Sequence, residues 1–345
     1  MKKSTLIIIG VLVLILTDLI YGSYKFKQAK NLTSNSNDQT TSEAKETEPQ
    51  KENESPNTLV FVGDIMLSRT VGTKILKAGD VNSPFLKTAS VTQNADVAFA
   101  NLESPFLDTG ARMTAGMVFK AEPDTVAGLV YAGFDIVSLA NNHFGNQGQK
   151  GMAYTFSLLK KNNINYVGAG ENSTRAAEPK IIEKNGLKFA FLGYDDVNST
   201  ITPQSYVAQS AQAGLNPLSE LKIAQDVIEA KKTADLVIVS LHWGTEYKTA
   251  PNNNQIKIAH VAIDNGASIV IGHHPHVVQY FNGQPYEKYK DGYVFYSLGN
   301  FVFDQMWSEN TKKGLIARIS LKGKNIEKVE GIPITIYDYF QPKID

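Results

Sequence analysis

The feature that most restricts the fold of this chain is a repeated pattern in which a short apolar run ends in polar residues that can bind a metal. Continuous apolar runs of about four to eight residues are typical of strands buried in a sheet. The residues that follow six such runs are Asp64, Glu103, the group Asn141, Asn142 and His143, His242, the group His273, His274 and His276, and Asn300. Because ligand sites in α/β sheets lie beyond the carboxyl ends of the strands, we expect these side chains to meet at one edge.

Each of these residues, taken alone, has an ordinary structural role open to it. Asp and Asn are common in turns and at helix N-termini, Glu103 fits a solvated loop, and His242 fits a packed core histidine. The segment HHPH is different, because three histidines within four residues are hard to explain by packing, and we predict a metal or anion site there. An extended backbone would point His274 and His276 to the same side. His260 lies in an amphipathic helical pattern without polar companions, so we expect it to be structural.

Short apolar runs alternate with helical patterns along the chain. The runs predicted to be strands are 59–62, 97–100, 136–139, 166–168, 189–192, 236–241, 269–271, 293–297, 315–321 and 331–336. The segments with helical periodicity are 123–132, 151–162, 218–233 and 255–264. This alternation predicts an α/β domain with largely parallel pairing in its first part. The last two runs have no helix between them, which predicts an antiparallel pair.

Composition narrows the chemistry of the site. The 34 Lys and Arg residues balance 34 Asp and Glu residues, which argues against nucleic acid as a partner, since such proteins usually carry a basic excess. The chain has no Cys, so disulfides, thiolate zinc sites, iron–sulfur clusters and a Cys nucleophile are excluded. A metal must therefore be held by His, carboxylate, amide or water, a donor set that suits Mn, Fe or Zn.

The first part of the chain has the pattern of a membrane anchor followed by a linker. Lys2 and Lys3 precede an apolar stretch from Leu6 to Tyr21, and neither a clear small-residue cleavage site nor a Cys for lipid attachment follows. We predict that residues 1–22 form an uncleaved, single-pass anchor, with a cleaved signal peptide as the alternative. Residues 23–57, nearly all polar, are predicted to be a disordered linker. The domain 58–345 would then lie at the cell membrane, outside the cytoplasm.

Several long motifs occur in order along the chain: VGDIMLSR at 62–69, FANLESP at 99–105, SLANNHFGNQG at 138–148, SLHWGTEY at 240–247, GHHPHVVQ at 272–279 and YSLGNFVFDQ at 296–305. Together they resemble the CapA family of membrane-anchored proteins of poly-γ-glutamate capsule synthesis. The order of acidic, Asn–His and His–x–His pieces also resembles the metallophosphoesterase (calcineurin-like) superfamily. The resemblance, which covers about residues 59–321, implies a four-layer α-β-β-α sandwich of two mixed sheets and one or two divalent metal ions.

The resemblance also implies a role for individual residues. The implied metal ligands are Asp64, Glu103, Asn142, His242, His274 and His276. His143 matches the histidine expected to act as general acid near a leaving group. The residues expected to support these ligands or to contact the substrate are Asn141, His273, Asn300 and Asp304.

Three positions depart from the broader patterns. The metallophosphoesterase pattern has a histidine where this chain has Met66 and an aspartate where it has Glu103, and CapA-like sequences share both changes. The CapA pattern usually has an aspartate where this chain has Asn146. We expect the loss of that charge to weaken metal binding or the orientation of His143. The missing histidine at position 66 leaves a mononuclear site open.

Three functions remain open at this point. The first is metal-dependent phosphoester hydrolysis or transfer at the cell surface. The second is a non-catalytic part of a membrane synthase or export complex that binds the anionic polymer through its metal-binding edge. The third is a decayed fold used only for protein contacts. Trp243, Tyr247 and Trp307 lie near the motifs, and we expect core packing for each, with a substrate groove as the alternative.

Overall fold

The computed structural model describes residues 57–345, which belong to one compact unit, Asn53–Asp345. The predicted anchor, and the predicted linker apart from its last residue, lie outside the described residues. Within 57–345, no helix has the length and apolar character needed to cross a membrane.

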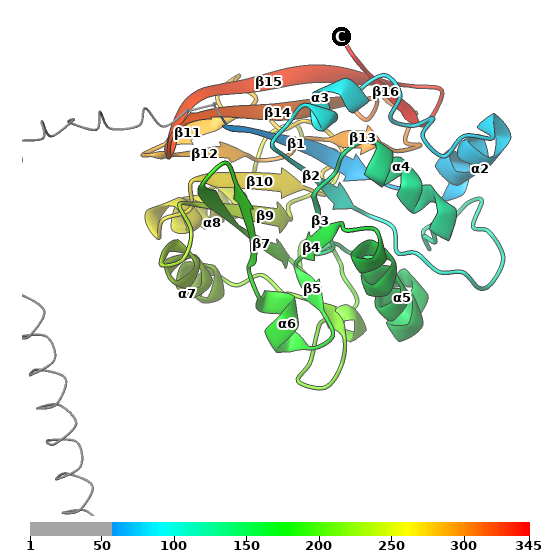
Figure 1. Ribbon diagram of the computed structural model, residues 1–345, viewed down its shortest axis with the longest axis horizontal. Coiled ribbons are helices and arrows are strands. Elements are labelled where there is room, and N and C mark those ends of the chain that lie inside the picture. Colours follow the sequence, from blue (N-terminus) through cyan, green and yellow to red (C-terminus); the bar gives the residue numbers. More distant parts are fainter. Residues whose placement is uncertain (1–56) are drawn as a thin grey trace, which may run out of the picture. The chain divides into compact units, whose positions relative to one another are not determined.

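The first sheet has eight strands and mixed pairing (Figure 1). Its order is β16-β15-β14-β1-β2-β3-β4, and β13 adds a parallel pair to β1. The strands are β1 (Asn57–Ile65), β2 (Val97–Leu102), β3 (Ile136–Ser138), β4 (Asn165–Val167), β13 (Asn300–Val302), β14 (Lys313–Lys322), β15 (Asn325–Tyr337) and β16 (Gln341–Ile344). Strands β1 to β4 are parallel, and β14 and β15 form the predicted antiparallel pair.

The second sheet has six strands in the order β11-β12-β10-β9-β7-β6. They are β6 (Lys180–Lys184), β7 (Leu187–Asp195), β9 (Leu236–His242), β10 (Ile269–His273), β11 (Glu287–Tyr289) and β12 (Gly292–Phe295). The four central strands are parallel, and the two edge strands pair antiparallel. A small separate sheet joins β5 (Ala169–Gly170) to β8 (Gly214–Leu215).

The two sheets pack against each other because alternate side chains of each strand point to opposite faces. Phe61 and Phe99 of the first sheet share one buried cluster with Phe191 and Ile238 of the second. The Phe99 and Phe191 rings stack with their centroids 5.8 Å apart. The alternate residues face helices instead. The layers therefore run from helices through two sheets to helices.

The helices divide between the two outer faces (Figure 1). They are α2 (Arg69–Ala78), α3 (Ala89–Gln93), α4 (Val126–Tyr131), α5 (Gly148–Lys161), α6 (Ser173–Ala177), α7 (Glu220–Lys231) and α8 (Asn253–Asp264), with short 3₁₀ turns η1 (Pro123–Thr125), η2 (Phe144–Gln147) and η3 (Gln204–Tyr206). Side chains of α2, α4 and α5 pack on the first sheet, and those of α7 and α8 pack on the second. All ten predicted strands are present, whereas the structure also has elements that were not predicted: α2, α3, α6, β5, β6, β8, β11, β13 and β16.

Candidate metal centre

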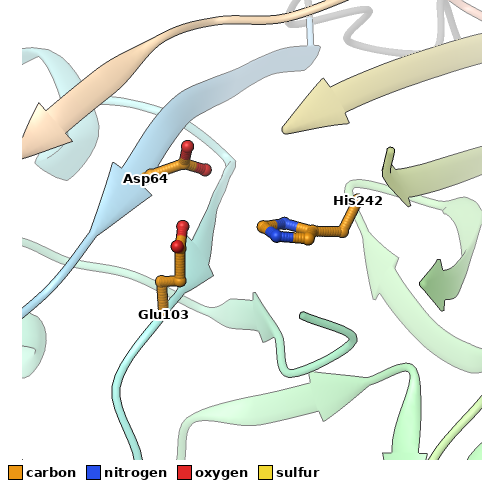
Figure 2. Close-up of side chains that lie close together, drawn as sticks. All are labelled: Asp64, Glu103 and His242. Atoms are coloured by element: carbon orange, nitrogen blue, oxygen red, sulfur yellow. The ribbon is translucent and has the colours of Figure 1, made fainter. Parts of the chain in front are cut away.

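Three strand ends bring two carboxylates and an imidazole together. Asp64 lies in β1, Glu103 directly follows β2, and His242 ends β9 of the other sheet. One ligand atom from each lies within 4.8 Å of the others, and all three residues are buried. Figure 2 shows the two carboxylates facing the imidazole ring. The centre therefore lies where the carboxyl ends of the two sheets meet, as the pattern of strand ends predicts.

The amide of Asn101 lies at the middle of this group. Its Nδ2 atom donates to Asp64 Oδ1 at 2.9 Å and to Glu103 Oε2 at 3.3 Å, and lies 3.4 Å from His242 Nδ1. Asn141 Nδ2 in turn donates to Asn101 Oδ1 at 3.1 Å. The sequence analysis missed Asn101. Asn101 lies two residues before Glu103, and residues two apart in extended backbone face the same side, so this position could have been predicted from Glu103.

The HHPH segment adds three buried histidines to the centre. His273 Nδ1 lies 3.2 Å from Asp64 Oδ1, and the backbone N–H of His274 donates to Asp64 Oδ2 at 3.4 Å. His276 Nε2 lies 3.6 Å from Glu103 Oε1. The expectation of an extended backbone here was wrong: φ is +95° at His274 and +57° at His276. A left-handed turn, costly for residues other than Gly, brings these rings to within 6.1 Å of each other.

Asn300 sets which nitrogen of His276 carries the proton. The Asn300 amide nitrogen donates to the backbone carbonyl of Thr311 at 3.0 Å, so its other atom is the oxygen. This oxygen lies 2.9 Å from His276 Nδ1 and must accept from it. In the neutral ring the lone pair is therefore on Nε2, which faces Glu103. Asn300 orients the imidazole, a supporting role of the kind that the resemblance implies.

The Asn142–His143 pair borders the same centre. Asn142 Oδ1 lies 3.1 Å from His242 Nε2, and His143 Nε2 lies 3.9 Å from Glu103 Oε1. The ring of His143 stacks on Phe119 with centroids 3.8 Å apart. Both residues are therefore at the centre, on the side of the first sheet.

Asn146 keeps His143 oriented without a charge. Asn146 Oδ1 accepts from the backbone N–H of Phe119 at 2.6 Å, which identifies it as the oxygen, and it lies 3.0 Å from His143 Nδ1. His143 Nδ1 must therefore donate, and Nε2 faces the carboxylate. The expected weakening of His143's orientation does not occur, because an amide oxygen takes the place of the carboxylate oxygen.

Burial sets most of the protonation states at the centre. Burial lowers the pKa of His143 to about 4 and that of His274 to about 3, and it holds the pKa of His242 well below its usual range. These rings are therefore neutral at neutral pH, the state in which imidazole binds metals.

The pKa values of the two carboxylates shift in opposite directions. Burial raises the pKa of Glu103 well above its usual value. Burial acts in the same direction on Asp64, but hydrogen bonds and charges from His273 and His276 outweigh it and hold the pKa of Asp64 well below its usual range. Burial also opposes the charge of His276, yet Glu103 and Asp64 raise its pKa to about 9. In the metal-free protein, ionised Asp64 therefore lies beside protonated His276.

The donor set fits a divalent cation. Buried atoms without a hydrogen-bond partner among the described residues include Glu103 Oε1, His273 Nε2 and His274 Nδ1. Buried polar atoms are nearly always paired, so the unpaired atoms of Glu103, His273 and His274 call for another ligand. Carboxylate oxygen, imidazole nitrogen and amide oxygen together suit Mn, Fe or Zn.

Asp304 lies beside the centre rather than in it. It forms an ion pair with Arg69 and accepts from the backbone N–H of Thr70 at 3.2 Å, which fixes the start of α2. The Arg69 guanidinium lies 4.6 Å from the Phe119 ring, the same ring that stacks on His143. Asp304 thus supports the wall behind His143.

The aromatic residues near the motifs divide into two groups. Trp243 is fully buried and donates to the Tyr296 carbonyl at 2.9 Å, which confirms the expected core packing. Tyr247 is 44% exposed and Trp307 is 64% exposed, so that expectation was wrong for these two. His260 lies away from the centre, stacked on Tyr289 and 3.1 Å from the Glu287 carboxylate, which confirms its structural role.

An open cavity of about 1010 Å³ lies elsewhere, between α6 and the β4 and β6 strands. Lys160, Tyr166 and Arg175 are among its lining residues, and none of the residues of the centre lines it. This cavity is therefore separate from the candidate site, which the chemistry of the donor set places at the strand ends.

Solved structures share this architecture. A hypothetical protein from Thermus thermophilus aligns with a TM-score of 0.52 at 16% identity, covering 81% of this chain and 100% of that one. A structure titled as a novel phosphatase, from Mycoplasma pneumoniae, aligns with a TM-score of 0.50 at 16% identity, covering 82% and 94%. At this identity the likeness concerns the fold alone, and the two mixed sheets are consistent with a metallophosphoesterase-like fold.

Sequence comparison identifies the family. The model described as "Bacterial capsule synthesis protein PGA_cap" matches residues 58–305, and the chain belongs to this family. "Capsule biosynthesis protein CapA" of Bacillus anthracis is 34% identical over 81% of this chain and 68% of its own length. "PGA biosynthesis protein CapA" of Bacillus subtilis is 33% identical over 81% of this chain and 71% of its own length. The resemblance to CapA proteins is thereby confirmed.

Proposed function

We propose that this protein acts in poly-γ-glutamate capsule synthesis through a metal-dependent phosphoesterase-type site. The observation that carries the proposal is the buried group of Asp64, Glu103 and His242, with ligand atoms within 4.8 Å of one another. Membership in the capsule synthesis family and the names of the two CapA relatives support the biological context. The proposed ligands are Asp64, Glu103, Asn142, His242, His274 and His276.

Different residues of the centre bind the metal, position its ligands and transfer a proton. A divalent cation bound here supplies Lewis-acid polarisation of a phosphoryl oxygen and lowers the pKa of water. Asn101 and Asn300 hold Asp64 and His276 in place through the hydrogen bonds described above. His143 presents Nε2 to the centre, and when the ring is protonated the proton on Nε2 can pass to the leaving oxygen, while Nδ1 stays hydrogen-bonded to Asn146.

The test is metal-dependent hydrolysis of an aryl phosphodiester. The proposal predicts turnover with Mn²⁺ or Zn²⁺ that disappears in Asp64→Asn. His143→Gln should retain metal and lose about 10²- to 10⁴-fold in rate, the usual range for a general acid. His260→Gln is the matched control, since His260 bonds to Glu287 outside the centre. Absence of metal-dependent turnover, with metal bound, would refute the catalytic proposal.

A second function is favoured by the exposed aromatic residues beside the centre. Tyr247 and Trp307 are open to a large ligand, and the relatives are named for synthesis of a polymer. In this alternative the protein binds poly-γ-glutamate at the centre without cleaving it, as a non-catalytic component of a membrane synthase or export complex. Metal-dependent polymer binding without phosphodiester turnover would distinguish this alternative from the first.

We further propose that residues 1–22 anchor the chain in the cell membrane and that 23–57 tether the domain outside the cytoplasm. The support is the pattern of basic residues, apolar stretch and polar segment in the sequence. Fractionation of cells and protease accessibility of the domain test it. Release of an intact, full-length chain by a salt wash would contradict an anchor.

A further inference from the structure

Two exposed aromatic side chains, Tyr247 and Trp307, lie at the edge of the candidate metal centre. The Tyr247 ring lies against His276, with centroids 6.3 Å apart and planes 29° apart. The Trp307 ring meets Tyr247 at 5.9 Å and at an angle of 78°. Together they form a corner, which we call the aromatic corner, with one side against an expected metal ligand and the other toward solvent.

The backbone holds this corner firmly to the centre. Tyr247 has a φ of +63°, a left-handed conformation that is costly for a bulky residue. Its N–H donates at 2.8 Å to the carbonyl of Pro275, the residue between His274 and His276. The Trp307 loop is fixed through Gln305, which accepts from Asn300 at 3.1 Å. Both rings are therefore positioned by groups that also position His276.

Core packing does not explain the exposure of these rings. An aromatic pair has a large apolar surface, and a folded chain gains little from leaving it in water. Strained backbone that is retained at an exposed aromatic residue beside a reactive centre is typical of a ligand contact. The corner suits an uncharged, flat or apolar part of a ligand whose anionic part lies at the centre.

We propose that Tyr247 and Trp307 form a subsite for the backbone of a γ-linked glutamate chain. Each unit of such a chain has two methylene groups and a planar amide in its backbone. A carboxylate is attached to the Cα of each unit. The carboxylate suits the cation-binding centre, while the methylenes and amide suit aromatic faces. The inference rests on the proposed role in poly-γ-glutamate synthesis and is independent of phosphoester cleavage.

The tryptophans of this chain provide a direct readout. The chain has two, of which Trp243 is fully buried and Trp307 is 64% exposed. Quenching of fluorescence by acrylamide in the full-length, Zn²⁺-loaded protein should therefore report mainly Trp307. Oligo-γ-glutamate should protect Trp307 from quenching in a saturable manner. Tyr247→Ala should weaken this binding about tenfold or more, as expected for an aromatic anchor, whereas Tyr131→Ala on α4 should leave it unchanged.

The decisive control is oligo-α-glutamate of equal length. It carries the same charge, but its methylenes lie in the side chains and not in the backbone. Weaker protection by the α-linked chain, with binding still sensitive to Tyr247, supports the subsite. Equal protection by both chains, or protection by a neutral oligosaccharide in place of oligo-γ-glutamate, would overturn it. Phosphodiester turnover of the wild type tests the catalytic proposal separately, because the fluorescence measurement contains no phosphodiester.

Discussion

At the scale of single residues, the centre depends on neutral amides as much as on its carboxylates and imidazoles. Asn101, Asn146 and Asn300 each place an amide against a carboxylate or a ring nitrogen. Asn146 and Asn300 thereby assign the proton of a histidine to Nδ1 and leave Nε2 facing Glu103. Such supporting contacts typically affect metal affinity or rate by about 10- to 100-fold.

The role of Asn146 gives a prediction with two variants. Asn146→Ala removes the acceptor shared by His143 Nδ1 and the Phe119 N–H, so we expect the rate to fall about 10- to 100-fold with metal content unchanged. Asn146→Asp keeps an acceptor and adds a negative charge, which raises the pKa of His143. The limb of the pH–rate profile that belongs to His143 should then move to higher pH. Identical profiles for wild type and Asn146→Asp would show that this contact does not control His143.

The residues of the centre were predictable to the extent that they end strands. Asp64, Glu103 and His242 were found in this way, because turns and helix caps rarely place metal-binding side chains after so many buried strands at once. Asn101 was missed because it lies inside the apolar run and has no charge. The left-handed turn at His274 and His276 was also missed, since most residues other than Gly have negative φ and the HHPH segment contains no Gly.

At the scale of elements, the close approach of β1 and the segment before β13 places Asp64. The Asp64 N–H donates to the Gly299 carbonyl at 3.0 Å, and a Cβ built on Gly63 would lie 1.9 Å from the same oxygen. Glycine at position 63 is therefore required for this contact. The sequence analysis predicted β1 but not β13, a strand of three residues that follows closely on the predicted strand 293–297.

Gly63→Ala tests this close approach. The added methyl group must push β1 from Gly299 and displace the Asp64 carboxylate, so we expect metal affinity to fall about tenfold or more. The free energy of unfolding should fall by about 1–3 kcal/mol, the usual cost of overpacking. Metal titration and urea unfolding measure the two effects. Wild-type metal affinity in a folded Gly63→Ala protein would contradict the proposed dependence.

The end of β7 carries a buried carboxyl with a predicted effect on stability. Asp195 accepts from Thr202 at 2.5 Å and from Thr200 at 3.1 Å, and burial raises its pKa to about 7. In the unfolded chain this carboxyl ionises near pH 4. Between about pH 4 and 7 the folded state thus keeps a proton that the unfolded state has lost, so the contribution of Asp195 to stability falls as pH rises.

Asp195→Asn removes this titration. The free energy of unfolding of the variant relative to wild type should rise by roughly 1–4 kcal/mol between about pH 4 and 7 and remain level above pH 7. Urea unfolding of both proteins at several pH values measures the difference, in which the other titrating groups cancel. Parallel curves for the two proteins would mean that Asp195 titrates normally in the folded state.

At the scale of the whole molecule, the site exists only because two sheets pack face to face. Glu103 follows a strand of the first sheet and His242 ends a strand of the second, so their distance depends on the layer between the sheets. The alternation of strands and helices predicted an α/β domain but not the division into two sheets. That division depends on which faces pack together, and it came from the family resemblance.

Phe99 tests the link between this layer and the site. Its ring lies 5.8 Å from both Phe61 and Phe191, at the interface of the sheets. Phe99→Ala should lower the free energy of unfolding by about 3–5 kcal/mol. Metal affinity should fall as well, because the cavity allows the two sheets to shift. Phe134→Ala, on the helix-facing side, is the control and should lower stability with a smaller effect on metal affinity.

The most direct test of the central claim is the metal content of the purified protein. Elemental analysis and equilibrium titration of wild type should give one or two divalent ions per chain from among Mn, Fe and Zn. Asp64→Asn and His274→Gln should lose this binding, while His260→Gln should retain it. A folded wild-type protein that remains metal-free in saturating Mn²⁺, Fe²⁺ and Zn²⁺, or variants that bind as wild type does, would contradict the assignment of this centre.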